Sequence, residues 1–241
     1  MMKIKFLNLI KPPKKRKSIP RLDLEADNVV GFDREGQKII NLLNYTKVSG
    51  SSYSGVLYDI GYQTIVIDGK TLSGQRNPME RLKNVPLDFK NKSVLDLGCN
   101  QGGMLHALAK DIKVGVGLDY DYKMVNVANK IKSYHSNSNL DFFVFNLEKE
   151  NLEYIKDFIV EEIVDICFLL SVCMWLKNWK ELIVVCKGIS KKMLFESNGS
   201  AEQQNEQINF LNSIYKSVQV INETSEDDPI QKNRKLLLCY D

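Results

Sequence analysis

The stretch Val94-Leu-Asp-Leu-Gly-Cys-Asn-Gln-Gly-Gly103 decides the fold, because it joins a short apolar strand to the start of a helix. The strand runs into Gly98, and the helix follows Gly102 and Gly103. Glycines at such a junction let the backbone turn sharply and approach a ligand without a Cβ in the way. Ligands of open α/β sheets bind at the carboxyl ends of the strands, where this loop lies. The stretch therefore predicts a ligand-binding loop.

Two kinds of ligand compete for this loop. A dinucleotide-binding loop has the pattern Gly-x-Gly-x-x-Gly, which directs helix amides at a pyrophosphate. Here the spacing is Gly98-x-x-x-Gly102-Gly103, and Asp96 stands inside the strand itself. A carboxylate repels a pyrophosphate, whereas it attracts an ammonium or a sulfonium. The pattern therefore favours a cationic ligand group over NAD.

From Ser93 onward, short apolar runs alternate with amphipathic helical patterns. Strands are expected at residues 93–98, 114–119, 140–146, 164–172 and 192–197, and helices at 102–111, 122–134, 151–162, 179–189 and 202–217. Residues 217–223 and 234–240 follow as two strands with no helix between them, so we expect them to pair antiparallel. The predicted fold class is α/β and Rossmann-like, with a mostly parallel seven-stranded sheet, an antiparallel edge strand and a small N-terminal α/β extension.

The chain before Ser93 is expected to form two parts. Residues 1–30 read as a basic tail or arm, because Lys11-Pro-Pro-Lys-Lys-Arg-Lys17 is charged and broken by prolines. Such a tail is solvated, contacts phosphates, or makes a weak peripheral membrane contact. Residues 31–92 read as the N-terminal extension, with a helix over 33–47 and a hairpin turn at Asp68-Gly69. Residues 93–241 then form the main domain.

Composition excludes several classes of protein. The 241 residues include 33 basic and 30 acidic side chains, so a net charge of +3 gives no strong field for gathering nucleic acid. Five cysteines without a Cys-x-x-Cys pair indicate a reducing, cytoplasmic compartment and no zinc site. His106 and His135 are too few for a metal cluster, and His106 is expected to pack within its helix. No apolar run has the length of a transmembrane segment.

VLDLGCNQGG resembles motif I of the class I S-adenosylmethionine-dependent methyltransferases in its length, its acidic residue and its glycines. The resemblance continues over residues 93–241. VGLDYD is similar to the second strand of that family, which ends in an acidic residue for the ribose hydroxyls. FFVFNLEKE is similar to the third-strand motif that meets the adenine, and LLSVCMWL to motif IV, at the strand end facing the transferred methyl group. The resemblance implies S-adenosylmethionine as the cofactor.

The nucleoside half of the expected site follows from these motifs. Asp119 takes the ribose position, and its carboxylate can accept both hydroxyls of a diol. Asp119 follows Gly98 by 21 residues, which is the distance across one helix and back along the neighbouring strand. The resemblance places Tyr120 against the adenine, with the Asn146 side chain and the Leu147 amide at the edge of the base.

The methionine half of the expected site rests on fewer signals. Asp96 is expected to hold the loop and the methionine amine. Arg76, in GQRNP, is a candidate clamp for the methionine carboxylate, with a solvated surface arginine as the equal alternative. Gln101 can reach the same carboxylate. The complete set of expected cofactor-binding residues is Arg76, Asp96, Gly98, Asn100, Gln101, Gly102, Asp119, Tyr120, Asn146, Leu147 and Ser171.

The methyl acceptor has the weakest signals. Many O-methyltransferases of this family carry a histidine after the fourth strand, where this chain has Cys173-Met-Trp-Leu. Either a base comes from elsewhere, or the acceptor is an anionic oxygen or a neutral amine. Of Trp175 and Trp179, one can line the acceptor pocket, and at least one is expected to pack in the core. The motifs of the DNA methyltransferases are absent.

GQRNPMERL, followed by DFKNKSVLDLGCNQGGM, is similar to bacterial methyltransferases found with surface-polysaccharide biosynthesis enzymes. We therefore expect methyl transfer, to oxygen, on a small molecule or glycan such as a sugar or a sugar-linked phosphate. Two alternatives stay open: an RNA or protein methyltransferase that uses the basic tail, and a non-catalytic module that keeps the cofactor pocket. Neither a catalytic residue nor the oligomeric state follows from the sequence.

Overall fold

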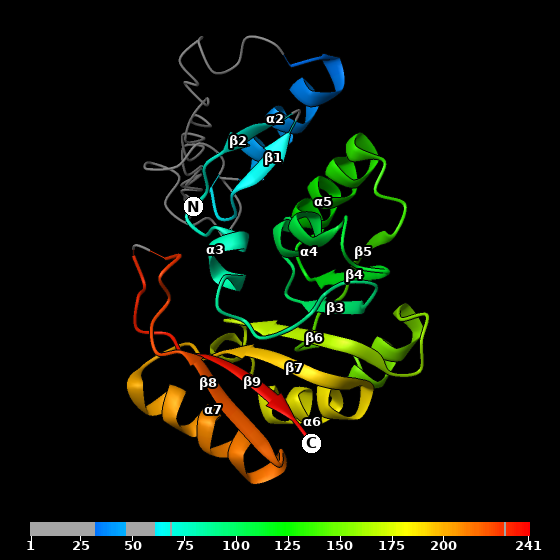
Figure 1. Cartoon of the computed structure of the whole chain (residues 1–241). Coiled ribbons are helices and arrows are strands. Elements are labelled where there is room, and N and C mark those ends of the chain that lie inside the picture. Colours follow the sequence, from blue (N-terminus) through cyan, green and yellow to red (C-terminus); the bar gives the residue numbers. More distant parts are fainter. Residues whose placement is uncertain (1–31, 47–60, 68, 229) are drawn as a thin grey trace, which may run out of the picture.

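The structure, a computed structural model, describes residues 32–46, 61–67, 69–228 and 230–241 (Figure 1). The expected basic arm at residues 1–30, with Lys11–Lys17, lies outside the described residues, and so does Asp68 of the expected hairpin turn. In the part of the chain that is described, no helix combines the length and the apolar character needed to cross a lipid bilayer.

The elements follow one another in the expected alternation. The helices are α2 (Arg34–Thr46), α3 (Pro78–Leu82), α4 (Gly103–Leu108), α5 (Tyr122–His135), α6 (Trp179–Ile189) and α7 (Ala201–Ile214), with 3₁₀ helices η1 (Leu152–Phe158) and η2 (Cys173–Trp175). The strands are β1 (Ile65–Ile67), β2 (Lys70–Leu72), β3 (Ser93–Leu97), β4 (Val114–Asp119), β5 (Leu140–Val144), β6 (Val164–Leu170), β7 (Ser190–Glu196), β8 (Ser217–Asn222) and β9 (Leu236–Tyr240).

Seven strands form one sheet in the order β5-β4-β3-β6-β7-β9-β8. The pairs from β5 to β7 are all parallel, whereas β9 is antiparallel to both β7 and β8. The predicted fold class is confirmed: the sheet is mostly parallel, and the antiparallel pair closes one edge. The strand order reverses between β3 and β6, and a sheet of this kind opens a crevice at such a point.

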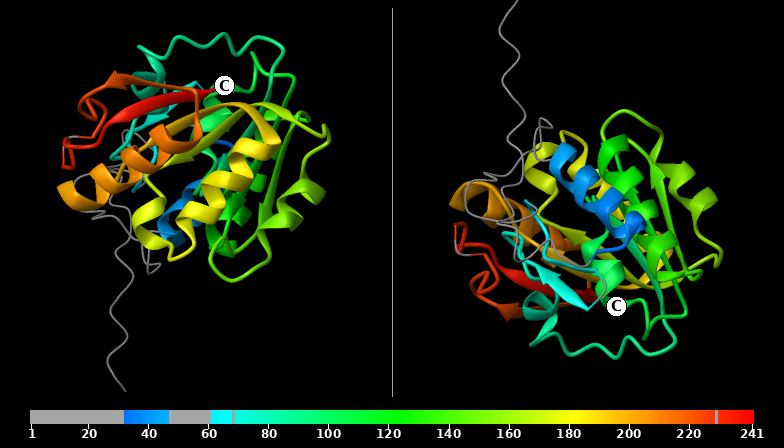
Figure 2. Two further views of the ribbon diagram at one scale, coloured as in Figure 1. Left: turned by 90° about the horizontal axis from the view of Figure 1, so that it is seen from below. Right: turned by 90° about the horizontal axis from the view of Figure 1, so that it is seen from above.

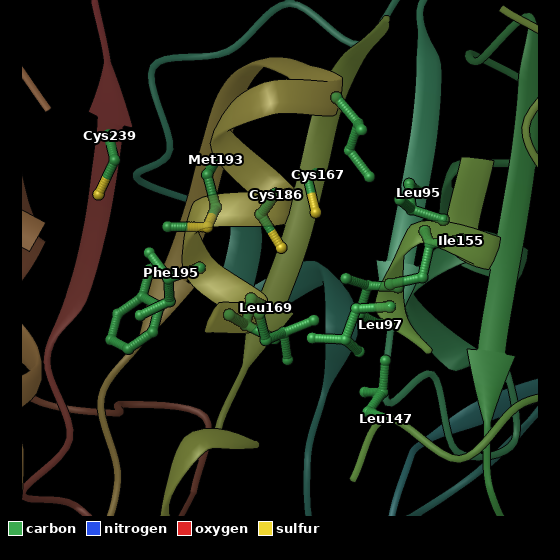
Figure 3. Packing of buried hydrophobic residues seen from close by; sticks show 14 of the residues in the cluster. Leu95, Leu97, Leu147, Ile155, Cys167, Leu169, Cys186, Met193, Phe195 and Cys239 are labelled. Atoms are coloured by element: carbon green, nitrogen blue, oxygen red, sulfur yellow. The ribbon is translucent and has the colours of Figure 1, made fainter. Parts of the chain in front are cut away.

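Successive side chains of the central strands point to opposite faces of the sheet and belong to two separate apolar clusters. Leu95 and Leu97 of β3 pack against α6, α7 and η1, while Val94 lies among residues of α4 and α5 on the other face. Figures 1 and 2 show these helices on opposite sides of the sheet, and Figure 3 shows the first cluster from close by. Because both faces are covered, these strands read as continuous apolar runs.

The N-terminal extension packs on the main domain through an apolar cluster of its own. Ile39, Ile40 and Leu43 of α2 and Ile65 of β1 lie against α5, which contributes Val127 and Ile131 among others. The expected helix is present, and Asp33 caps it, since Asp33 Oδ1 accepts from the Gly36 amide at 2.7 Å. β1 and β2 form the expected hairpin. A boundary at residue 92 stays a prediction.

One expected α-helix, over residues 151–162, is instead the shorter 3₁₀ helix η1. Its buried side chains, Leu152 and Ile155, are three residues apart, and a spacing of three matches the 3₁₀ repeat. η1 ends at Phe158, because the backbone of the following residue, Ile159, is extended. The apolar residues after Phe158 belong to the connection into β6 and not to a further helical turn.

Candidate functional site

A cavity of about 670 Å³ opens at the carboxyl ends of the parallel strands. Its lining comes from the ends of β3, β4 and β6, the chain after β5, and the segment before β3. The expected site residues that line it are Asp96, Gly98, Asn100, Asp119, Tyr120, Asn146, Leu147 and Ser171. Arg76, Gln101 and Gly102 are expected site residues that do not line it. The cavity thus brings together expected residues that lie between Asp96 and Ser171 in the sequence.

The glycine loop between β3 and α4 forms the floor of the cavity. Gly98 has φ 80° and Gly102 has φ 74°, in the left-handed region that glycine adopts without strain. A Cβ at Gly98 would lie 2.7 Å from the Val172 side chain, so the loop needs glycine here for space as well. Gly102 packs on the Phe142 ring, away from the cavity. The loop therefore presents bare backbone at Gly98.

Asp119 ends β4 and braces the loop while it faces the cavity. Its Oδ2 accepts from the Asn100 amide at 2.8 Å, and its Oδ1 from the Asp121 amide at 2.9 Å. Burial raises the pKa of Asp119, although these backbone hydrogen bonds oppose the shift. The Tyr120 amide also acts on this carboxylate and lowers its pKa. Because a carboxylate has about four lone-pair sites, Asp119 can brace the loop and still accept from a ligand.

Asp96 is the unsatisfied group of the site. It lies within β3, is 2% exposed, lines the cavity, and its Oδ2 has no hydrogen-bond partner among the described residues. Burial, together with Asp119, raises the pKa of Asp96 to about 7, while Arg81 acts in the opposite direction. A buried carboxylate without a partner is costly, so this oxygen is suited to a cationic ligand group.

Arg81 lines the cavity, and the sequence reasoning missed it. It belongs to α3, which Asn77 caps by accepting from the Met79 and Glu80 amides. The dipeptide Asn77-Pro78 is a helix-start signal, and it would have placed Arg81 on the first turn. Because Arg81 acts on the pKa of Asp96, a cation and a carboxylate stand close together at this end of the cavity.

Arg76 is not at the cavity. It is 1% exposed and binds Asp227 through Nε at 2.6 Å and Nη2 at 3.0 Å, and Glu196 through Nη1 at 3.2 Å and Nη2 at 2.7 Å. Its guanidinium is therefore committed to protein carboxylates, and neither expected alternative, a ligand clamp or a solvated arginine, fits this position. Gln101 is buried as well, and its Nε2 donates to Thr46 at 2.8 Å.

The far end of the cavity carries Tyr120, Asn146 and Leu147. Asn146 Oδ1 accepts from the amides of Glu148 at 3.0 Å and Lys149 at 3.2 Å, so it is already engaged within a turn. No described residue accepts from its Nδ2, which leaves a donor for a ligand. Tyr120 is 60% exposed and offers a broad aromatic surface.

At the end of β6, Ser171 and Trp175 line the cavity. Ser171 has φ 63°, which is uncommon for a residue other than glycine, and its hydroxyl donates to Glu196. Trp175 is 65% exposed, whereas Trp179 packs edge-on against Phe210. His106 binds the Ala128 carbonyl and His135 that of Val66, so neither histidine is at the cavity. Burial lowers the pKa of His106 to about 3 and keeps it neutral, as expected of a packed histidine.

A sheet of this order, with a glycine loop after its first parallel strand and an acid at the end of the second, defines a class I methyltransferase. The profile of a methyltransferase-domain family matches residues 88–230, and the chain belongs to that family. Its cofactor is S-adenosylmethionine. No protein of curated function matches the chain at the sequence level.

Solved structures with the same fold include the N-terminal domain of EvdMO1 in the presence of SAH and D-fucose, at 11% identity and a TM-score of 0.60. That match covers 87% of this chain and 97% of the other. WbdD, described as a bifunctional kinase-methyltransferase, matches at 20% identity and a TM-score of 0.54. The match covers 74% of this chain but only 44% of the WbdD chain, so this chain corresponds to less than half of WbdD.

Proposed function

We propose that this protein transfers the methyl group of S-adenosylmethionine to an oxygen of a sugar or of a sugar-linked phosphate. The observation that carries the cofactor half of the proposal is the cavity wall. It is lined by Asp96, whose Oδ2 has no partner among the described residues, by the Arg81 guanidinium and by the Asp119 carboxylate. The first two groups match the ammonium and the carboxylate of one molecule in charge, and Asp119 is an acceptor for its ribose hydroxyls.

The methionine end of the cofactor fits the Asp96 end of the cavity. Asp96 Oδ2 accepts a hydrogen bond from the ammonium and thereby gains a partner, which none of the described residues provides. Arg81, and not Arg76, takes the methionine carboxylate, because an arginine fork matches a carboxylate in shape and charge. Gly98 lines the same cavity as both groups and adds no side chain to it.

The nucleoside end fits the opposite part of the cavity. Asp119 lines this part of the cavity and accepts from the ribose hydroxyls, while the loop amides of Asn100 and Asp121 hold its carboxylate in place. Asn146 donates from Nδ2 to a ring nitrogen of the adenine, since its Oδ1 is engaged within the turn. No described residue accepts from the Leu147 amide either, and this amide is a second donor to the base. Tyr120 covers one face of the ring.

When bound, the cofactor supplies a methyl group that its sulfonium already activates. The chain therefore has to align the acceptor and exclude water. Among the described residues at this end, Glu196 is the nearest carboxylate to Ser171, yet Arg81 and Arg76 outweigh its burial and lower its pKa to about 2. A carboxylate held ionised in this way is a weak general base. An acceptor that is nucleophilic without a base, such as an anionic phosphate oxygen, suits this arrangement.

The acceptor class rests on a sequence resemblance, a structural neighbour and one exposed aromatic ring. The segment that carries Arg81 resembles bacterial methyltransferases found with surface-polysaccharide enzymes, and EvdMO1 was crystallised with D-fucose. The exposed ring of Trp175 at the mouth of the cavity suits the apolar face of a sugar. The proposal includes a role in polysaccharide biosynthesis and a location in the cytoplasm. All five cysteines are free thiols, which suits a reducing compartment.

Isothermal titration calorimetry with S-adenosylhomocysteine tests the cofactor half. We expect one site per chain for wild type and at least a tenfold loss of affinity for Arg81→Gln. Incubation with methyl-labelled cofactor and separate pools of sugars, sugar phosphates and RNA tests the acceptor half. Label in a sugar or sugar-phosphate pool supports the proposal, and label in RNA alone contradicts it. Cofactor binding without transfer to any pool would favour the non-catalytic module.

A further inference from the structure

Six charged side chains form a buried cluster next to the Ser171 end of the cavity, and none is more than 9% exposed. The members of this ion cluster are Arg76, Arg81, Arg234, Glu196, Asp227 and Asp228. Three are cations and three are anions, so the cluster as a whole is neutral. Burial of six charges is costly, and such clusters contribute little net stability compared with apolar packing. The cluster therefore points to a role in positioning side chains.

Glu196, the last residue of β7, is the hub of the ion cluster. It accepts from Arg76 at 2.7 Å and 3.2 Å, and from Arg81 at 2.6 Å and 3.2 Å. The hydroxyl of Ser171 also donates to it, and that of Ser225 lies 3.4 Å away. One carboxylate thus holds two guanidinium groups and the hydroxyl at the end of β6.

Of the six members only Arg81 lines the cavity, together with Ser171, while the three carboxylates lie behind that wall. The bonds to Glu196 occupy Nε and Nη2 of Arg81. No described residue accepts from Arg81 Nη1. Glu196 therefore decides which edge of the Arg81 guanidinium faces a ligand.

The ion cluster joins parts of the chain that are far apart in sequence. Arg76 and Arg81 precede β3, whereas Asp227, Asp228 and Arg234 belong to the loop between β8 and β9, which lies beside α3 in Figure 1. Asp227 accepts from Arg76 through both of its oxygens and, among the described residues, makes no hydrogen bond with Arg81 or Ser171. Asp227 is therefore a carboxylate of the same cluster that holds the chain without touching the cavity wall.

We propose that Glu196 is a positioning residue for the amino-acid part of the cofactor: it holds Arg81 so that the Nη1 edge meets the methionine carboxylate. This inference rests on the proposed function. It separates two roles within one cluster, since Glu196 acts on the ligand through Arg81, and Asp227 acts only on the docking of the segment before β3.

Two ligands and two matched variants test the inference by calorimetry. S-adenosylhomocysteine carries the carboxylate, whereas methylthioadenosine lacks the amino-acid part. For Glu196→Gln we expect about a tenfold loss of affinity for S-adenosylhomocysteine and an unchanged affinity for methylthioadenosine. Asp227→Asn, the same chemical change in the same cluster, should lower the melting temperature but leave both affinities within about threefold of wild type.

The outcomes separate the two proposals. Equal losses for both ligands, or an unchanged affinity of Glu196→Gln for S-adenosylhomocysteine, would overturn the positioning role while wild-type binding still supports the proposed function. Wild type that binds neither ligand overturns both. Adding Arg81→Gln to Glu196→Gln should cause no further loss beyond Arg81→Gln alone, because both changes remove the same contact. If Glu196→Gln does not fold, Glu196→Asp, which keeps the charge but withdraws it by one methylene, is held to the same expectations.

Discussion

Replacement of Asp96 by asparagine should stabilise the free protein and weaken cofactor binding at the same time. Asp96 is buried, one of its oxygens has no hydrogen-bond partner, and burial raises its pKa from 3.8 to about 7. A carboxyl group whose pKa is higher in the folded state leaves stability intact below pH 3.8. Stability then falls as the pH rises towards 7, because the folded state must hold a charge that the unfolded state holds freely.

The size of this effect follows from the shift. About three pKa units correspond to about 4 kcal/mol above pH 7 and to nothing below pH 3.8. Asparagine removes the charge but introduces N–H donors that need partners, which offsets about 1–3 kcal/mol. The net gain expected for Asp96→Asn is therefore about 1–3 kcal/mol at pH 8, or several degrees in melting temperature. At pH 4 the charge term is nearly absent and the N–H donors still need partners, so the variant should be less stable than wild type by about 1–3 kcal/mol.

Thermal and denaturant unfolding of both proteins at pH 4, 6 and 8 measures this difference. Asp165→Asn is a matched control at the opposite end of the sheet: Asp165 binds Lys191 and its pKa is lowered, so the change should not stabilise. Asp96→Asn should also bind S-adenosylhomocysteine at least tenfold more weakly, with methylthioadenosine unaffected. A variant that is less stable than wild type at pH 8, or that binds S-adenosylhomocysteine equally well, would refute the role of Asp96.

Three further changes follow from the same geometry. Asp119→Ala should weaken S-adenosylhomocysteine binding at least tenfold, and unchanged affinity by calorimetry would remove the ribose assignment. The same change should lower stability by about 1–3 kcal/mol, because the Asn100 amide loses its acceptor. Gly98→Ala should destabilise by about 1–3 kcal/mol, since φ is 80° and the Cβ would meet Val172; a melting temperature equal to wild type would count against this backbone geometry. Glu196 has a pKa lowered to about 2, so it contributes stability above pH 4.5 that is lost as the pH falls through 2. The unfolding free energy of Glu196→Gln should therefore be about 3 kcal/mol below that of wild type at pH 7, and this deficit should shrink between pH 4.5 and 2. A deficit that stays constant over this interval would argue against the ion pairs as its source.

The parts of the fold that sequence predicted are those decided by local pattern. Apolar runs alternate with helical stripes from Ser93 to the last residues, and both the mostly parallel sheet and the closing antiparallel pair follow from that alternation. The 3₁₀ helix after β5 was the exception, because Leu152 and Ile155 at a spacing of three satisfy a helical and a 3₁₀ pattern equally in the sequence.

The candidate site divides in the same way. Residues that follow directly from a strand end, such as Gly98 and Asp119, line the cavity as the motifs indicated. The choice between Arg76 and Arg81 depended on partners about 120 to 150 residues away, Glu196 and Asp227, which no local pattern reveals. Whether an arginine lines the cavity or is enclosed by protein is decided by tertiary packing, and Arg81 and Arg76 show the two cases five residues apart.

The central claim is that the cavity at the end of β3 and β4 holds S-adenosylmethionine through its own three charged groups. A crystal structure of the full chain with S-adenosylhomocysteine tests it most directly. The account predicts ribose hydroxyls on Asp119, the ammonium on Asp96 and the methionine carboxylate on Arg81. Density for the nucleoside outside this cavity, or a carboxylate that contacts none of these side chains, would contradict it.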